Sequence, residues 1–178
     1  MSILGLSSNS GDEPKPTGSL FINFAPSANG WKEGKTEFEM RDVKIVFDMD
    51  SVKTGWMKWA EDKSTPPDKV WAEKAGAKLP SPGEGYKLAF SIELTLNDER
   101  RIWESNGTGA VMGLDAIYDE MAQTREGDKL PLCRYTKSEP VKIGKGSTRI
   151  PQFEIVEWVE RPIALSSVDD AQSAAAEW

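Results

Sequence analysis

The chain of 178 residues contains no histidine and a single cysteine, Cys133. The absence of histidine excludes imidazole general-base catalysis and every Ser-His or Cys-His catalytic arrangement. One cysteine cannot form an internal disulfide or supply the ligands of a structural zinc site. These absences point away from an enzyme, and we expect a protein that acts without a cofactor.

Long apolar runs are also missing. No stretch approaches the roughly 20 apolar residues that a membrane-spanning helix needs, and the N-terminus lacks the basic start, apolar core and cleavage site of a secretory signal. The sequence therefore predicts a soluble cytoplasmic protein with no membrane partner. A chain of 178 residues with 38% hydrophobic content is long enough for one core, so we expect a single domain.

Both ends of the chain are poor in large apolar residues. Residues 1–19 contain five serines, three glycines and two prolines, a composition that predicts a flexible leader. Residues 163–178 contain Asp169, Asp170 and Glu177, no Lys or Arg, and Trp178 at the end. A terminal tryptophan on an acidic, disordered tail suggests an anchor for a partner protein, and a solvated terminus without a partner is the alternative. The domain itself is then expected over residues 20–162.

Alternating apolar and polar residues predict a mainly β domain. Tyr86–Leu96 has an apolar residue at every second position, which indicates a half-buried strand. Asn97-Asp98 forms a tight turn, after which Arg100–Glu104 returns as a second strand. Upstream, Thr36–Phe47 alternates in two phases, and this slip implies a β-bulge near Asp42.

One helix and one long insertion complete the pattern. Apolar residues from Val111 to Met121 follow helical spacing and predict a helix with Thr108 as its N-cap and Gly127 as its stop. Ala60–Gly85 is rich in proline, glycine and charge, so we expect a long insertion with one short helix around Asp68–Ala75.

Positive charge is concentrated in one stretch of this acidic chain. From Lys129 to Phe153 there are six Lys or Arg residues and one Glu, whereas the whole chain has a net charge of −7. Gly144 and Gly146 favour a hairpin turn between two flanking strands. We expect this basic hairpin to contact an anion.

Strands, one helix and a closing strand pair form the order of an OB-fold, a five-stranded barrel. Its strands are expected at Thr36–Phe47, Tyr86–Leu96, Arg100–Glu104, Val141–Ile143 and Thr148–Trp158. The long insertion then lies between the first two strands and the basic turn between the last two, where the fold usually contacts nucleic acid. A β-sandwich crossed by one helix is the alternative.

Seven tryptophans are many for a chain of this length, and several stand beside Lys or Arg. Bases stack on aromatic side chains while cations hold phosphates, so this combination favours a groove for single-stranded nucleic acid. The alternative, above all for Trp56, Trp103 and Trp158, is packing in the core. The residues expected to contact nucleic acid are Trp56, Trp59, Trp71, Lys87, Arg101, Trp103, Tyr135, Lys142, Lys145 and Arg149.

Two groups of carboxylates are the only candidates for a Mg²⁺ site. Asp48 and Asp50 stand near the end of a predicted strand, and Asp115, Asp119 and Glu120 stand on the solvent side of the predicted helix. Both positions have an ordinary explanation as solvated faces, so we expect no metal site. A metal-dependent nuclease is the less favoured alternative.

The chain resembles single-stranded-DNA-binding proteins, most of all those of tailed phages and prophages. The likeness lies in Trp103-Glu-Ser-Asn-Gly before the helix, the basic hairpin, the closing segment Ile150–Pro162 and an acidic tail that ends in an aromatic residue. In that family several aspartates usually stand directly before the terminal aromatic, whereas an alanine-rich spacer separates Asp170 from Trp178 here.

The resemblance implies an OB-fold protein that coats single-stranded DNA without strong sequence preference during replication, recombination or repair. Its tail would recruit replication or recombination proteins, and a homo-oligomer stays open. A phage structural or assembly protein, whose tryptophans pack an interface and which binds no nucleic acid, is the alternative function.

Overall fold

The computed structural model describes residues 20–61 and 65–165. Within them the chain forms mainly β-structure, as the alternating pattern predicted. The elements are β2 (Phe21–Ala25), the short 3-10 helix η1 (Pro26–Ala28), β3 (Gly30–Glu33), β4 (Thr36–Phe38), β5 (Ile45–Lys58), β6 (Asp68–Trp71), β7 (Lys87–Leu96), β8 (Glu99–Ser105), α1 (Thr108–Thr124), β9 (Leu130–Ile143) and β10 (Gly146–Val159). No helix among these residues is long and apolar enough to cross a membrane.

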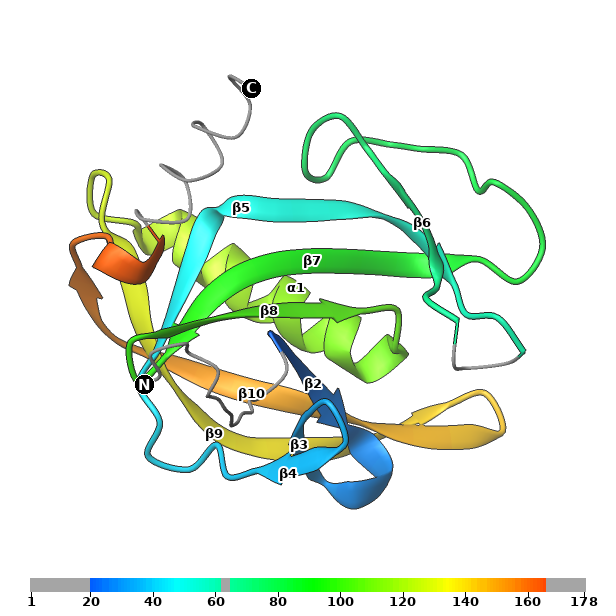
Figure 1. Ribbon diagram of the computed structural model, residues 1–178, viewed down its shortest axis with the longest axis horizontal. Helices are drawn as coiled ribbons and strands as arrows, with labels where there is room; N and C mark the ends of the chain where they lie inside the picture. The colour runs from blue at the N-terminus through cyan, green and yellow to red at the C-terminus, as the bar shows by residue number, and fades with distance from the viewer. Residues whose placement is uncertain (1–19, 62–64, 166–178) are drawn as a thin grey trace, which may run out of the picture.

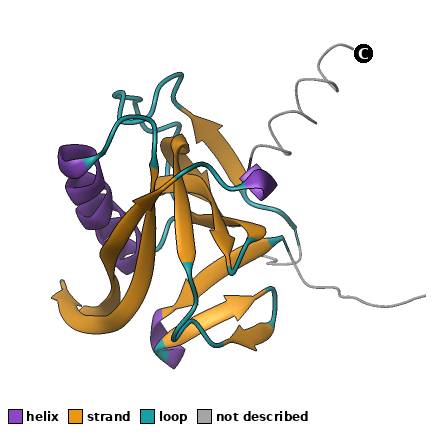
Figure 2. Ribbon diagram, turned by 90° about the vertical axis from the view of Figure 1, so that its left-hand side faces the viewer, coloured by secondary structure: helices purple, strands orange, loops and turns teal. Residues whose placement is uncertain are grey.

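The strands of the described residues form one nine-stranded sheet in the order β10-β9-β5-β7-β8-β2-β3-β4, with β6 paired to β5 beside this path (Figure 1). β5, β7 and β8 are antiparallel neighbours, and β9 returns to lie beside β5, which is a Greek-key arrangement. β2 joins β8 in parallel through Phe21 and Ile22, and so brings the N-terminal strands into the sheet. The sheet is strongly curved and α1 lies along one side of it (Figure 2).

β5 is the longest central strand, and it differs from the first strand predicted. It begins at Ile45, because β4 ends at Phe38 and the chain then turns at Asp42, whose φ is 63°. The predicted bulge near Asp42 is therefore wrong, and the irregularity in pairing falls between Asp48 and Lys53 instead. This bend lets the first half of β5 pair with β9 and its second half pair with β6.

The two predicted hairpins are confirmed. Asn97 and Asp98 have φ values of 50° and 74°, the left-handed backbone that a tight β7–β8 turn requires. The basic hairpin turns at Gly144, with a φ of 56°, and its strands are 14 residues each. The strand predicted at Val141–Ile143 is only the end of β9, which begins at Leu130. The prediction missed the earlier residues because apolar and charged side chains alternate there too irregularly to show a strand in the sequence.

The insertion between β5 and β7 is held against the sheet. β6 occupies part of it, so the helix predicted around Asp68–Ala75 is wrong. Beyond β6, the amide of Gly76 donates to the Thr54 hydroxyl at 2.7 Å, and the Trp56 indole donates to the carbonyl of Leu79 at 2.7 Å. The segment is therefore fixed over the second half of β5.

The predicted helix is confirmed as α1, although its N-cap is Gly107 and not Thr108. It packs closely along β10 through two glycines. A Cβ atom on Gly109 would lie 2.0 Å from the carbonyl oxygen of Arg149, and one on Gly113 would lie 2.6 Å from that of Pro151. Only glycine allows this approach of helix to strand.

Gly113→Ala is therefore expected to lower the free energy of unfolding by about 1–3 kcal/mol, although alanine favours a helix over glycine by about 1 kcal/mol. Urea denaturation followed by circular dichroism measures the difference. Gly146→Ala is the matched control, because its Cβ would find no atom closer than 3.9 Å. A Gly113→Ala variant as stable as the parent would contradict the close packing of α1 on β10.

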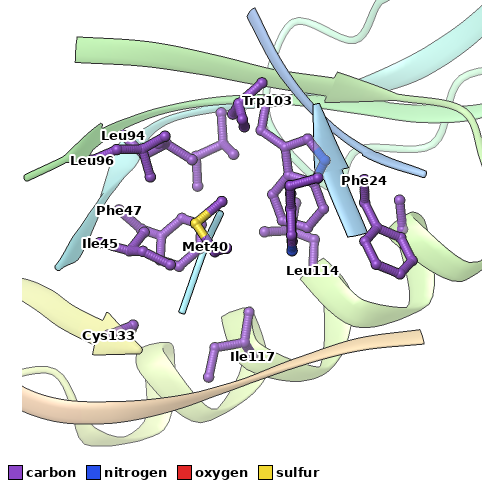
Figure 3. Packing of buried hydrophobic residues seen from close by; sticks show 14 of the residues in the cluster. Phe24, Met40, Ile45, Phe47, Leu94, Leu96, Trp103, Leu114, Ile117 and Cys133 are labelled. Carbon is purple, nitrogen blue, oxygen red and sulfur yellow. The ribbon is translucent and has the colours of Figure 1, made fainter. Parts of the chain in front are cut away.

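The core lies between the curved sheet and α1, and its centre is aromatic (Figure 3). Trp103 is 0% exposed, and its ring centroid lies 4.8 Å from that of Phe90 and 5.1 Å from that of Trp31. A smaller cluster joins Val46, Leu130 and Leu165. Leu165, predicted to belong to the tail, is thus buried against the sheet.

Candidate nucleic-acid interface

The residues predicted to contact nucleic acid fall in separate parts of the structure. Trp103 is fully buried, so the alternative stated for it, packing in the core, holds. Arg101 is engaged by two carboxylates, with its Nε 2.7 Å from Glu33 and its guanidinium 3.1 Å from Glu99. Neither residue is free to contact a base or a phosphate.

One group lies where β5, β6 and β7 meet. Trp59 is 48% exposed and Lys87 is exposed, whereas Trp56 and Trp71 are half-buried. Trp71 pairs with Gly55 across β6 and β5. Trp59 is therefore the aromatic side chain of this group that offers most surface for stacking.

A second group lies on the β9–β10 hairpin. Lys142 and Lys145 are exposed near its tip, and neither forms an ion pair within the described part of the chain. Arg149 is turned inward: its Nε donates to the Ser138 hydroxyl at 2.7 Å, and its guanidinium also donates to the Ser138 carbonyl at 3.2 Å. The Ser138 hydroxyl donates in turn to the Asn29 side chain, which links the hairpin to the N-terminal strands.

A cleft of about 710 Å³ opens between the N-terminal strands and β9, and we name it the β4–β9 cleft. Its aromatic lining residues are Trp31, Phe38 and Tyr135, and its charged ones are Lys32, Arg41, Lys137, Arg149, Glu37 and Glu39. Tyr135 stands edge-on to Trp31 with ring centroids 5.6 Å apart, so the core holds its ring in place. The lining holds four cations and two carboxylates, of which Arg41 and Glu39 form an ion pair. Lys137 pairs with Glu139 at 3.1 Å, whereas Lys32 forms no ion pair within the described residues.

The cleft brings together two of the predicted residues, Tyr135 and Arg149. It also adds four that sequence reasoning missed, Lys32, Phe38, Arg41 and Lys137. The sequence did hold one signal, because Lys32 stands next to Trp31. β3 and β4 have only four and three residues, too few to show a strand pair in the sequence.

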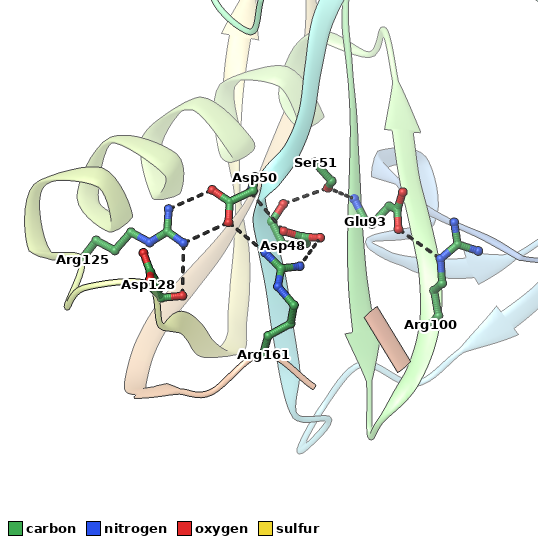
Figure 4. A network of polar contacts seen from close by, with 8 residues as sticks. All are labelled: Asp48, Asp50, Ser51, Glu93, Arg100, Arg125, Asp128 and Arg161. Atoms are coloured by element: carbon green, nitrogen blue, oxygen red, sulfur yellow. Dashed lines mark hydrogen bonds and ion pairs between the residues drawn. The ribbon is translucent and has the colours of Figure 1, made fainter. Parts of the chain in front are cut away.

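Asp48 and Asp50 are held in a network of ion pairs (Figure 4). Arg161 contacts Asp48 and Asp50, each at 2.8 Å, and Arg125 forms a two-fold contact with Asp50 at 3.0 Å. Burial raises the pKa of Asp48, although the hydrogen bond from Arg161 opposes this, and the hydrogen bonds from Arg125 lower the pKa of Asp50. These contacts give the pair a structural role, because they join β5 to the end of α1 and to the segment after β10.

The second carboxylate group, on α1, forms no metal-like cluster. In residues 20–61 and 65–165 no three Asp, Glu or Cys side chains stand close enough together to hold an ion. Neither carboxylate group therefore supports the nuclease alternative by its geometry.

The residues predicted to recruit partners, Asp169, Asp170, Glu177 and Trp178, lie outside the described residues, and so does the predicted leader 1–19. The likeness to single-stranded-DNA-binding proteins thus rests on the sequence features given above. No protein-family model, curated protein or solved structure matches this chain.

Proposed function

We propose that the protein binds single-stranded DNA without strong sequence preference, in the β4–β9 cleft and along the β9–β10 hairpin. The observation that carries this proposal is the lining of the cleft, where the partly buried rings of Phe38 and Tyr135 stand with four cations, Lys32, Arg41, Lys137 and Arg149. Bases stack on aromatic faces whatever their sequence, and cations hold the phosphates. Lys142 and Lys145 extend the positive surface along the hairpin.

We further propose that β5, β7, β8, β9 and β10 form an OB-type core to which β2, β3 and β4 are an addition. Support comes from the Greek-key order of these strands and from the position of α1 between the third and the fourth. The insertion before β7 and the β9–β10 turn lie toward the same end of the molecule in Figure 1. In OB-folds these two loops flank the bound oligonucleotide.

In this proposal the protein acts in the cytoplasm during replication, recombination or repair, and it has no catalytic step of its own. The acidic tail, through Asp169, Asp170, Glu177 and Trp178, recruits replication or recombination proteins.

Titration with an oligo-dT strand, followed by tryptophan fluorescence at low salt, tests the proposal. We expect quenching that saturates, mainly of Trp59, which is 48% exposed, because Trp31 is only 4% exposed beneath the cleft. Double-stranded DNA of equal length should compete weakly, since paired bases cannot stack on side chains. The absence of any binding at low salt would contradict the proposal and favour the assembly protein.

The salt dependence of binding locates the contacts. Each phosphate contact that is removed should flatten the plot of log K against log salt concentration by roughly 0.7. Lys142→Ala with Lys145→Ala tests the hairpin, and Lys32→Ala with Lys137→Ala tests the cleft. Arg149 is left in place because it holds Ser138.

Lys44→Ala with Lys129→Ala is the matched control, because it removes the same charge outside the cleft and the hairpin tip. The control pair should leave the slope unchanged. If all three pairs change the slope equally, the positive charge acts at long range and the proposed contacts are wrong.

A further inference from the structure

A second hollow, which we name the α1 groove, lies between α1, the second half of β5, the first half of β7 and the segment 75–80. Its volume is about 890 Å³, within the range of ligand sites in proteins, roughly 300–1,000 Å³. No residue lines both this groove and the β4–β9 cleft. The two hollows are therefore separate sites.

The walls of the α1 groove are mostly apolar. Val52, Trp56, Leu88 and Phe90 line it from the sheet. Leu88, the second residue of β7, is 59% exposed and presents an apolar side chain to this groove. The hydrogen bonds from Trp56 and Gly76 hold the segment 75–80 in position, so the groove is part of the fold.

The rim of the α1 groove is acidic along the helix. Asp115 and Asp119 line it from one face of α1, since residues four apart are neighbours on a helix. Both are exposed, and neither pairs with a cation among the described residues. α1 contains no Lys or Arg, and Lys78 on the opposite wall is the one cation in the lining.

We propose that the α1 groove binds a short segment of a partner protein that carries apolar side chains flanked by Lys or Arg. The apolar side chains would fill the space over Leu88 and Phe90, and the cations would meet Asp115 and Asp119. Nucleic acid does not suit this site because two carboxylates repel phosphates. An acidic segment is disfavoured for the same reason. The inference stands whether or not the protein binds DNA.

The probe is a fluorescein-labelled peptide of 12 residues, made of leucine and lysine in amphipathic helical spacing. A twin with glutamate in place of every lysine tests the role of charge. Binding to the full chain is measured by fluorescence anisotropy at physiological salt. We expect the lysine peptide to bind at least tenfold more tightly than its twin, and a twin that binds equally well would overturn the proposal.

Asp115→Asn with Asp119→Asn should weaken binding roughly fivefold, the effect of losing two exposed ion pairs. The control, Glu157→Gln with Glu160→Gln, removes the same charge from exposed positions elsewhere and should change binding less than twofold. If both double variants weaken binding equally, the peptide responds to the net charge of the protein and not to Asp115 and Asp119, and the proposal is overturned.

Occupation of the groove itself is tested with Ala77→Trp, which places a large ring among the lining residues. Binding should fall more than tenfold, and Ala116→Trp, an exposed change on α1 outside the lining, should leave it unchanged. Leu88→Ser tests the same wall without altering the segment 75–80, and should also weaken binding. Unchanged binding to both groove variants would overturn the proposal.

Two further measurements distinguish other occupants of the α1 groove. A saturating oligo-dT strand should leave the peptide affinity within twofold, and displacement would assign the α1 groove to nucleic acid. Self-association that Ala77→Trp abolishes would assign it to a second copy of the chain. Either of these results would overturn the proposal, whereas failure of oligo-dT to bind at all would contradict only the proposed function.

Discussion

Trp103→Ala is expected to lower the free energy of unfolding by about 3–5 kcal/mol, the cost of truncating a large aromatic side chain in a core. Trp103 is 0% exposed, and it contacts the rings of Phe90, Trp31 and Phe153. Alanine would leave a cavity at the point where the sheet and α1 meet. Urea denaturation followed by circular dichroism measures the loss.

Trp59→Ala is the matched control, because this side chain is 48% exposed. We expect its stability to stay within about 0.5 kcal/mol of the parent. Its DNA affinity should fall by roughly 1–3 kcal/mol if bases stack on it. A Trp103→Ala variant with unchanged stability would contradict the position of Trp103 in the core.

Arg161→Ala is expected to destabilise the protein by about 3 kcal/mol, the low end for breaking a buried ion pair, because the arginine itself is partly exposed. The side chain of Asp48 is 4% exposed and would lose the cation that neutralises it. Thermal unfolding at neutral pH measures the effect. Asp48→Asn in the Arg161→Ala background should restore most of the loss, because an amide carries no charge.

The loss should also depend on pH. Burial raises the pKa of Asp48 above that of the unfolded chain, and removing Arg161 takes away the group that opposes this rise. In the folded variant Asp48 then holds its proton more tightly than in the unfolded chain. The loss of unfolding free energy relative to the parent is therefore complete at neutral pH, and it shrinks as the pH falls through the pKa of Asp48. A deficit that is the same at neutral and acid pH would contradict this account.

The elements that the sequence predicts well are those set by neighbours in the chain. β7 and β8 follow from strict alternation and from Asn97-Asp98, and α1 follows from its apolar spacing. The tip of the basic hairpin follows from Gly144. In each case a local turn and a repeating pattern specify the same structure.

Other elements depend on distant partners, and the sequence does not show them. β6 looks like part of a polar loop, and it pairs with β5 because Gly55 leaves room: a Cβ there would lie 2.0 Å from the carbonyl oxygen of Val70. Trp59 and Trp103 both stand near cations in the sequence. The sheet separates them, because Trp103 has a neighbouring strand on each side, with Ile92 of β7 and Ile22 of β2 as its partners.

The candidate cleft shows the same division. Arg149 was found because its segment is visibly basic, whereas Phe38 ends the three-residue strand β4 and Arg41 lies in the turn after it, so no basic pattern marks them. Their position opposite Tyr135 arises from tertiary contacts between the two ends of the chain.

The parallel pairing of β2 with β8 has a consequence for how the chain is made. Phe21 pairs with Ile102, and the Asn29 side chain meets Ser138, 109 residues later. A ribosome releases the N-terminal strands first, but their partners emerge only after many further residues have been translated. Contacts this distant also form slowly, because a long loop must close first. The β4–β9 cleft can therefore be completed only when β9 and Arg149 of β10 have left the ribosome, so a nascent chain lacks it until then.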